Sequence, residues 1–436
     1  MDGASHRLRR LTPPGVPTTT ARSRRRPAGA YPFIERQSGR TGLAKQKILI
    51  AGAGIGGLVA ASCLMKDGHD VEIYEQAPEL GEVGAGIQLS ANPMHVLTYI
   101  GLADAVNAIS VRPEAYVFRL FDTGDQVQRF ALAEEHERMH RAPYNQIHRA
   151  DFHELLAAKA REFKADVVHL NKTAVGFEES EDAVTLRFAD GSSATGDLLI
   201  GADGVKSAIR AQIAGEVTAT YTGDAAWRLT VPVERLPENF MGHVMSVWVG
   251  PGRHAVCYYI RGGALLNFVG CVETPVEAEE SWTARFPWED LHADFEGWHP
   301  DIMTIIDKVD RDKCYRWALF TRPALPEWST RRVTILGDAA HPTLPYLAQG
   351  AAMAIEDGAV LTRALAQEET IPGALQLYQR NRTARTAKIV DQSMQNRTLF
   401  HLHSEAEIRA SFAQRDEGED RNAWLYSYNP LTVELT

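Results

Sequence analysis

The order of apolar and polar positions predicts two kinds of segment, and the first is an alternation of strands and helices. Lys47-Ile48-Leu49-Ile50-Ala51 is a short apolar run that leads directly into glycines. Apolar residues then recur with helical spacing from Leu58 to Met65 and stop at Gly68, and residues 71–75 form a second strand-like run. A strand, a helix and a strand in this order predict the βαβ opening of a doubly wound parallel sheet.

The second kind of segment is rich in strands and lies in the middle of the chain. Between Gly223 and Cys271, four strand-like runs are separated by turn residues. The runs are Trp227–Val233, His243–Val249, His254–Ile260 and Leu265–Val272. They predict an antiparallel sheet inserted into the nucleotide-binding fold. The alternating pattern flanks it, with these expected elements: a helix over Arg149–Arg161, strands over Ala183–Phe188, Asp197–Gly201 and Arg332–Leu336, and a long helix over Gln349–Ala366.

These patterns predict an α/β protein with an α+β insert, divided into five segments. The segments are a disordered basic extension over 1–44, the first part of a nucleotide-binding domain over 45–222, an inserted sheet domain over 223–330, the second part of the nucleotide-binding domain with its long helix over 331–400, and a tail over 401–436. Residues 1–44 carry nine Arg against two acidic residues and lack an amphipathic period. Disorder, a start codon placed too far upstream and an organellar transit peptide all remain open for this extension.

Composition narrows the class of protein. No apolar run reaches the roughly 18 residues that span a bilayer, which predicts a soluble, cytoplasmic protein without a membrane span. The net charge is −10 and the basic residues of 1–44 leave the remaining chain still more acidic, so we expect no nucleic-acid partner. The four cysteines are scattered, which predicts reduced thiols and no structural metal.

A glycine motif follows the first predicted strand. Gly52, Gly54 and Gly57 stand in G-x-G-x-x-G register, and Glu75 lies at the end of the second strand. The glycines allow a tight turn, close approach of the backbone to a pyrophosphate and close packing of helix on strand, while the carboxylate suits ribose hydroxyls. A helix N-terminus offers free N–H groups to the phosphates. The motif predicts a dinucleotide site, although a glycine-rich turn without a ligand has the same letters.

Two further motifs identify the cofactor through a resemblance. They are 197–207, which contains Asp203-Gly204, and Gly337-Asp338-Ala339-Ala340-His341-Pro342. With these motifs the chain resembles the single-component flavoprotein aromatic hydroxylases of the para-hydroxybenzoate hydroxylase fold over about residues 45–400. The resemblance implies bound FAD, NADH or NADPH as reductant and O2 as co-substrate. It makes segments 45–222 and 331–400 the FAD-binding domain and segment 223–330 the substrate-binding domain. It also implies cofactor contacts at Gly86, Arg149, Asp203, Asp338, Gly350 and Ala351. A turn role for Asp203 and a helix-cap role for Asp338 are the alternatives.

The inserted sheet supplies candidate catalytic residues. His254 and Tyr258 are four residues apart and therefore lie on the same face of a strand. This pattern is similar to the branch that includes 3-hydroxybenzoate 6-hydroxylase, 6-hydroxynicotinate 3-monooxygenase and salicylate hydroxylase, which implies that His254 deprotonates a substrate hydroxyl and that Tyr258 lies beside the ring. Histidine suits this role because its ordinary pKa is near 6.5. An edge-strand histidine beside a core tyrosine is the structural alternative.

Three other residues are expected to contact a small aromatic substrate. Arg228 is a candidate partner for a substrate carboxylate or phenolate, and a structural ion pair is its alternative role. Pro342 and Tyr346 lie in the loop that the resemblance places beside the flavin. That loop differs from the 6-hydroxynicotinate and salicylate enzymes at Tyr346-Leu347-Ala348, so the sequence leaves the substrate open.

The expected function is therefore FAD-dependent hydroxylation of a phenolic or hydroxy-aromatic acid. Two alternatives remain at this point: a tailoring monooxygenase that acts on a larger natural product, and a non-catalytic flavin-binding module. The sequence also leaves open whether the protein forms a homodimer.

Overall fold

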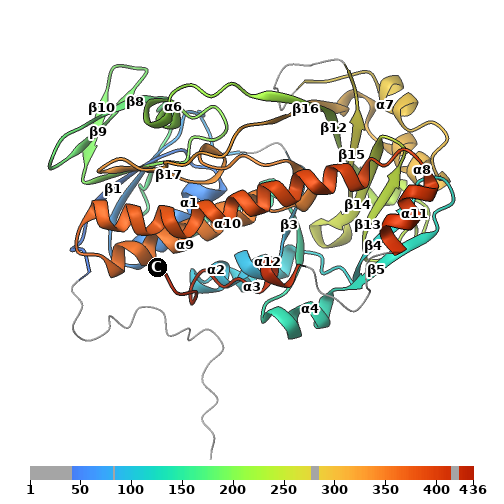
Figure 1. Cartoon of the computed structure of the whole chain (residues 1–436), viewed down its shortest axis with the longest axis horizontal. Helices are drawn as coiled ribbons and strands as arrows, with labels where there is room; N and C mark the ends of the chain where they lie inside the picture. Colours follow the sequence, from blue (N-terminus) through green and yellow to red (C-terminus); the bar gives the residue numbers. More distant parts are fainter. Residues whose placement is uncertain (1–41, 82–83, 276–283, 414–421) are drawn as a thin grey trace, which may run out of the picture.

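A five-stranded parallel sheet forms one half of the molecule (Figure 1). The computed structural model describes residues 42–81, 84–275, 284–413 and 422–436. The strand order is β17-β11-β1-β2-β7. The strands are β1 (Lys47–Ala51), β2 (Asp70–Tyr74), β7 (Val168–His169), β11 (Leu198–Gly201) and β17 (Val333–Ile335). Every neighbouring pair is parallel, so the predicted doubly wound sheet is confirmed.

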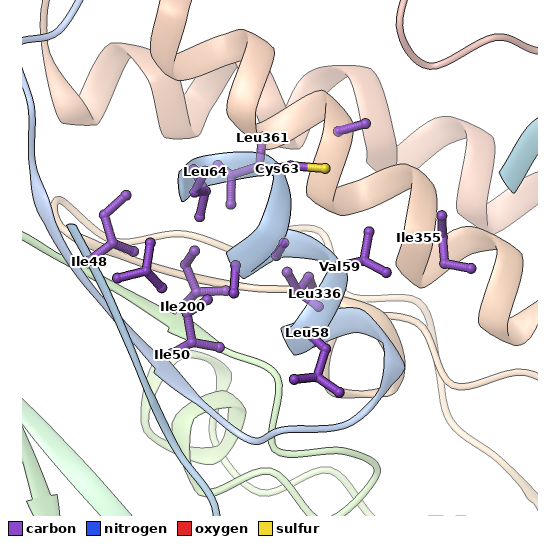
Figure 2. Close-up of a cluster of buried hydrophobic side chains, with 14 of the residues drawn as sticks. Ile48, Ile50, Leu58, Val59, Cys63, Leu64, Ile200, Leu336, Ile355 and Leu361 are labelled. Atoms are coloured by element: carbon purple, nitrogen blue, oxygen red, sulfur yellow. The ribbon is translucent and has the colours of Figure 1, made fainter. Parts of the chain in front are cut away.

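The core of this half lies between the sheet and its helices. The helices are α1 (Ile55–Lys66), α5 (Arg149–Phe163) and α9 (Gly350–Gln367). Strand β1 lies between β11 and β2, and its residues Ile48 to Ala51 are fully buried, which is why its sequence is continuously apolar. Figure 2 shows Ile48, Ile50 and Ile200 of the sheet beside Leu58 and Leu64 of α1, with Leu361 of α9 next to Leu64.

A seven-stranded sheet forms the other half, in the order β16-β12-β15-β14-β13-β4-β5. The strands are β4 (Ala115–Leu120), β5 (Gln126–Ala131), β12 (Thr220–Pro232), β13 (Met245–Gly250), β14 (Arg253–Ile260), β15 (Leu265–Glu273) and β16 (Tyr315–Thr321). The four predicted strands of the insert are present as β12 to β15. Strands β4 and β5 also belong to this sheet, although the predicted boundaries place 115–131 in the FAD-binding part. The reason is the parallel pairing of β4 with β13, in which Val117 pairs with Ser246, a long-range contact that local patterns do not reveal.

Shorter elements complete the two halves. The small strands are β3 (Gly86–Leu89) and β6 (Asn145–His148), which pair with each other, and β8 (Ala174–Glu179), β9 (Val184–Phe188) and β10 (Ser193–Gly196), which form a three-stranded sheet. The remaining helices before the long pair are α2 (Ala91–Tyr99), α3 (Ala103–Ile109), α4 (Ala133–His140), α6 (Ala208–Ala214), α7 (Trp288–Asp294) and α8 (Pro300–Lys308). Figure 1 shows α4 on the opposite side of the long helices from β12 and β16.

Helix α10 (Ile371–Phe400) runs from the parallel sheet to the seven-stranded sheet (Figure 1). It is longer than α9, the long helix that the sequence predicts, and the two helices pack along each other. Residues 401–436 are not simply a tail. They include α11 (Glu405–Ala413), which contacts β5, and α12 (Ala423–Tyr426), and they bury Ile408, Phe412, Leu425 and Leu431. Burial of these apolar side chains holds the C-terminal region against the body.

The N-terminal extension falls mostly outside the described residues. Of the predicted disordered segment 1–44, the structure describes 42–44, and there the Leu43 N–H donates to the Leu365 carbonyl at 3.4 Å. A Cβ on Gly42 would come within 2.3 Å of the Ala366 carbonyl oxygen. Residues 42–44 therefore lie against the C-terminal end of α9. In the described part of the chain, none of the helices combines the length and the apolar character needed to cross a bilayer.

Candidate active site

A cavity of about 1120 Å³ takes its walls from both halves of the molecule. The parallel half contributes Gly54 and the N-terminus of α9, and the seven-stranded sheet contributes Arg228, His254 and Tyr258. A cavity of this size lies at the upper end of the range for ligand pockets. It has room for a large cofactor together with a small substrate.

The glycine motif forms the cofactor side of this cavity. Gly52 has φ +106°, and a Cβ there would lie 2.3 Å from the Ala202 carbonyl oxygen; a Cβ on Gly57 would lie 2.1 Å from the Gly52 carbonyl oxygen. These two glycines allow α1 to approach the strands closely. Gly54 has open space instead and lines the cavity, where it is the N-cap of α1 with no side-chain cap. The uncapped helix N-terminus can therefore bind an anion such as a pyrophosphate.

Glu75 shapes the same loop. Its carboxylate accepts hydrogen bonds from the Ala53 N–H at 2.8 Å and from the Ala77 N–H at 2.9 Å. A carboxylate has about four lone-pair positions. Glu75 therefore fixes the glycine loop and still has acceptor capacity for ribose hydroxyls, although it is not itself a lining residue of the cavity.

Asp338 and Arg149, two of the predicted cofactor contacts, both line the cavity. Asp338 is exposed and lines the cavity, and among the described residues no hydrogen bond engages its carboxylate. It does not cap the 3-10 turn that contains it. Its helix-cap alternative therefore does not apply here. Arg149 lines the cavity from the first residue of α5, and its N–H donates to the Ala85 carbonyl at 2.8 Å.

Asp203 makes its hydrogen bonds within its own turn and at the start of the helix that follows. Its carboxylate accepts from the Ser207 hydroxyl at 2.5 Å and from the Ile209 N–H at 3.3 Å, at the start of α6. Burial raises the pKa of Asp203, and the Ser207 hydrogen bond opposes that rise. Asp203 does not line the cavity, whereas its neighbours Ala202 and Gly204 do. The motif thus contributes backbone to the cofactor side, and Asp203 holds that backbone.

The other three predicted cofactor contacts, Gly86, Gly350 and Ala351, also line the cavity. Gly350 and Ala351 line it from the first turn of α9, whose N-cap Gln349 makes no side-chain cap. The positive end of that helix dipole favours negative charge on a bound ring. Gly86 also lines the cavity, and a Cβ there would lie 2.6 Å from the Tyr258 ring. These residues, the open Gly54 and the uncapped α1 fit an FAD molecule.

His254 lines the cavity from strand β14 of the seven-stranded sheet. It is 2% exposed, and its Nδ1 lies 2.8 Å from Nε2 of His401. Burial lowers the pKa of His254 well below its usual value, and the nearby His401 lowers it further. The ring is therefore neutral near pH 7. Because Nδ1 is bound to His401, Nε2 is the nitrogen left to accept a proton from a ligand in the cavity.

Tyr346 lines the cavity with its ring, but its hydroxyl is already bound. The ring centroid lies 5.2 Å from that of His254, and the hydroxyl donates to Asp224 at 2.5 Å. Burial raises the pKa of Tyr346 well above its usual value. Tyr346 can therefore pack against a substrate ring, and it is a poor candidate for a base. Pro342, the other loop residue predicted to contact substrate, is not among the lining residues, while Thr343 to Ala348 are.

Tyr258 and Arg228 complete the predicted set. Tyr258 is buried and lines the cavity, and burial raises the pKa of its hydroxyl, which the hydrogen bond with Gln88 opposes. Arg228 lies with its guanidinium carbon 4.6 Å from the Trp317 ring centroid. It lines this cavity and also a second one of about 560 Å³. An Arg held over a ring in this way presents its N–H groups to an anion.

Sequence patterns missed three polar groups of the site. His401 and Asp224 contact the predicted residues His254 and Tyr346, and both come from positions far away in the chain. Gln128 of β5 lines the cavity at 3% exposure, and neither its amide nitrogen nor its oxygen has a partner among the described residues. Buried polar atoms without partners are rare, so Gln128 is a candidate ligand contact. The only signal for these residues in the sequence is their residue type.

Comparisons with known proteins identify the class. The family model for the FAD binding domain matches residues 45–393. The 3-hydroxybenzoate 6-hydroxylase of Polaromonas naphthalenivorans strain CJ2 is 39% identical over 389 residues, which cover 88% of this chain and 96% of that protein. The 6-hydroxynicotinate 3-monooxygenase of Bordetella bronchiseptica is 34% identical over 81% of this chain and 92% of that protein.

Solved structures agree in fold. Klebsiella pneumoniae HpxO, complexed with FAD and uric acid, superposes with a TM-score of 0.76 at 28% identity, over 84% of this chain and 92% of that one. A salicylate hydroxylase substrate complex gives a TM-score of 0.75 at 23% identity, over 88% and 96% of the two chains. The chain belongs to the FAD-binding-domain family. It is a flavoprotein monooxygenase with the fold of the para-hydroxybenzoate hydroxylases, as the resemblance implied.

Substitution of Glu75 by Ala tests the cofactor side. The variant loses both hydrogen bonds that fix the glycine loop, together with the acceptors for ribose hydroxyls. Each charge-assisted hydrogen bond contributes about 1.5–3 kcal/mol, so the Kd for FAD should rise at least about tenfold. Reconstitution of the apoprotein, followed by flavin fluorescence, measures this Kd. Glu79→Ala changes an exposed residue four positions away and serves as the control. An unchanged Kd in Glu75→Ala would remove Glu75 from the cofactor site.

Proposed function

We propose that the protein hydroxylates an aromatic ring that carries a hydroxyl group and a carboxylate, using FAD, NADH or NADPH, and O2. One observation carries the proposal. The neutral, buried His254 lines the same cavity as the glycine loop and the α9 N-terminus that fit FAD. A base and a redox cofactor can therefore act on one small substrate.

The base explains why a phenol is the expected substrate. An aromatic ring attacks an electrophilic oxygen far better when its hydroxyl is ionised, so the protein must remove that proton at neutral pH. His254 can accept it at Nε2. When bound, FAD supplies the electrophilic oxygen after reduction by NADH or NADPH and reaction with O2.

The rest of the cavity wall suits an aromatic acid. Val256, Leu319 and Leu344 give it apolar surface, which excludes water from the reacting ring. Arg228 can form a bidentate pair with a carboxylate. Tyr346 and Tyr258 offer ring faces and edges against which a flat substrate can stack.

The relatives support the same substrate class. The names of those at 34–39% identity describe enzymes that act on 3-hydroxybenzoate, 3-amino-4-hydroxybenzoate and 6-hydroxynicotinate. Each of these compounds has a ring hydroxyl and a carboxylate. We therefore extend this class of substrate to the present chain, with a cytoplasmic location, where both nicotinamide reductants are available.

A panel of aromatic acids tests the proposal. The FAD-loaded protein is mixed with NADH or NADPH in air, together with 3-hydroxybenzoate, salicylate or 6-hydroxynicotinate. At least one acid should accelerate oxidation of the reduced nicotinamide and yield a product with one additional oxygen atom. Benzoate is the matched control, because it lacks the hydroxyl that His254 would deprotonate. Nicotinamide oxidation that no hydroxylated acid stimulates would contradict the proposed function.

The His254→Ala variant tests the base. It should retain FAD, while the oxygen-transfer rate at pH 7 falls by about 10²–10⁴-fold, the usual contribution of a general base. This defect should shrink as the pH approaches the pKa of the free phenol, where water supplies the phenolate. Because the pKa of His254 is lowered, the wild-type protein keeps its neutral base as the pH falls through 6.5, where an ordinary histidine becomes protonated.

Rapid mixing of reduced protein with O2 and substrate over a pH series measures these rates. Tyr258→Phe should give a milder defect, because Tyr258 only positions the ring. Equal oxygen-transfer rates in wild type and His254→Ala at neutral pH would show that His254 is structural.

A further inference from the structure

His401 bridges His254 and the surface of the protein. Its Nε2 lies 2.8 Å from Nδ1 of His254, and its other ring nitrogen, Nδ1, is buried without a hydrogen-bond partner in the described part of the chain. Two carboxylates are the nearest acceptors. Oε1 of Glu273 lies 3.6 Å from this Nδ1, and Oδ1 of Asp224 lies 3.8 Å from it. The two imidazoles therefore connect the cavity to a pair of carboxylates.

A proton taken from substrate cannot remain on His254. The ring is buried, and a buried cation without a paired carboxylate costs several kcal/mol. The lowered pKa of His254 reflects that cost, and burial likewise lowers the pKa of His401 to about 4. His254 therefore needs a neighbouring group that accepts the proton from it.

Glu273 is the better of the two acceptors. The oxygens of Asp224 are already bound by the Arg397 guanidinium, at 2.5 and 2.8 Å, and by the Tyr346 hydroxyl, and its side chain is fully buried. The Glu273 side chain is 35% exposed at the end of β15. It can change rotamer to close the 3.6 Å gap, and it can release a proton to water.

We propose that His254, His401 and Glu273 form a proton relay that carries the hydroxyl proton of the substrate from the cavity to solvent. This inference rests on the proposed function. The substrate O–H bond breaks as an N–H bond forms at His254 Nε2. The Nδ1 proton of His254 moves to His401 Nε2, and the Nδ1 proton of His401 moves to the Glu273 carboxylate. Each ring gains one proton and loses one, so neither carries a net charge at the end of the transfer.

The other charged and titratable groups around His401 affect the relay in different ways. Asp224 stabilises positive charge on His401 during the transfer, and Arg397 opposes it. His403 lies 3.9 Å from Glu273 at the surface and opposes a positive charge on His401. The thiol of Cys271 lies in the wall of the cavity, and burial raises its pKa, so it stays protonated and takes no part.

A chromophoric phenol tests the relay without turnover. A hydroxynitrobenzoate is mixed with oxidised, FAD-loaded protein in the absence of reductant, and the change in absorbance reports formation of its phenolate. The variants are His401→Gln, which keeps a hydrogen-bonding side chain but cannot pass a proton between two ring nitrogens, and Glu273→Gln at the surface. His292→Gln is the matched control, since His292 lines neither cavity.

The relay predicts slower ionisation of the bound probe in both variants. At neutral pH the rate should fall about tenfold or more in His401→Gln, with FAD content and probe affinity unchanged. Glu273→Gln should show a similar loss. The ionisation rate in the wild-type protein should decrease in D2O. A plot of this rate against the deuterium fraction of the solvent should be curved, because several protons move together. In both variants the plot should be linear. His292→Gln should match wild type.

Wild-type rates and curvature in both variants would overturn the relay and show that His254 exchanges its proton directly with water in the cavity. If His401→Gln fails to bind FAD, Glu273→Gln decides the question, because a surface carboxylate can be changed without altering the core. The probe is independent of hydroxylation. If the probe ionises as expected but no hydroxy acid gives a product, the proposed function is rejected and the relay is not. If a hydroxy acid is hydroxylated but both variants ionise the probe at the wild-type rate, the relay is rejected and the proposed function is not.

Discussion

The position of helix α10 is the constraint on which the site depends. In the first half of the helix, Arg382 is fully buried and pairs with Asp357 and Glu356 of α9, each at 2.7 Å. Near the C-terminal end of the helix, Arg397 pairs with Asp224 of the seven-stranded sheet. The helix has 30 residues, which corresponds to about 45 Å. The ion pairs of these two arginines therefore connect the two halves of the molecule through one helix.

The same ion pairs place residues of the active site. Asp357 accepts a hydrogen bond from the Gly337 N–H at 2.9 Å and lies 2.6 Å from His341 Nε2, which fixes the turn that carries Asp338. At the far end, α10 brings Phe400 and His401 to His254. Loss of one member of such a buried pair leaves an uncompensated charge, typically at a cost of about 3–5 kcal/mol. The geometry of the cofactor side and that of the base are thus linked through one helix.

The sequence predicted the parts of the site that follow from local rules. The glycines, Glu75 and Asp338 stand in motifs whose spacing depends on one turn, and His254 and Tyr258 share a face of one strand. The contributions of long-range pairing could not be predicted. Strands β4 and β5 join the second sheet through a parallel pairing, and His401 reaches His254 across 147 residues. Asp203 shows a third limit, since the motif does not reveal that its carboxylate is hydrogen-bonded to Ser207 and that its neighbours Ala202 and Gly204 line the cavity.

Burial changes the chemistry of these residues in ways that residue type does not reveal. His254 is neutral because it is buried, whereas the Tyr346 hydroxyl is hydrogen-bonded to Asp224. Both residues were predicted to contact substrate, but only His254 has an atom available to accept a proton. Oxygen transfer by this monooxygenase requires both halves of the cavity to act on one substrate.

The most direct test of that claim is the fate of molecular oxygen. The FAD-loaded protein is supplied with reduced nicotinamide, a hydroxylated aromatic acid and isotopically labelled O2, and the product is examined by mass spectrometry. The account predicts one labelled oxygen atom on the ring for each nicotinamide oxidised. Nicotinamide oxidation that yields only hydrogen peroxide with every acid, or a product whose new oxygen comes from water, would contradict it.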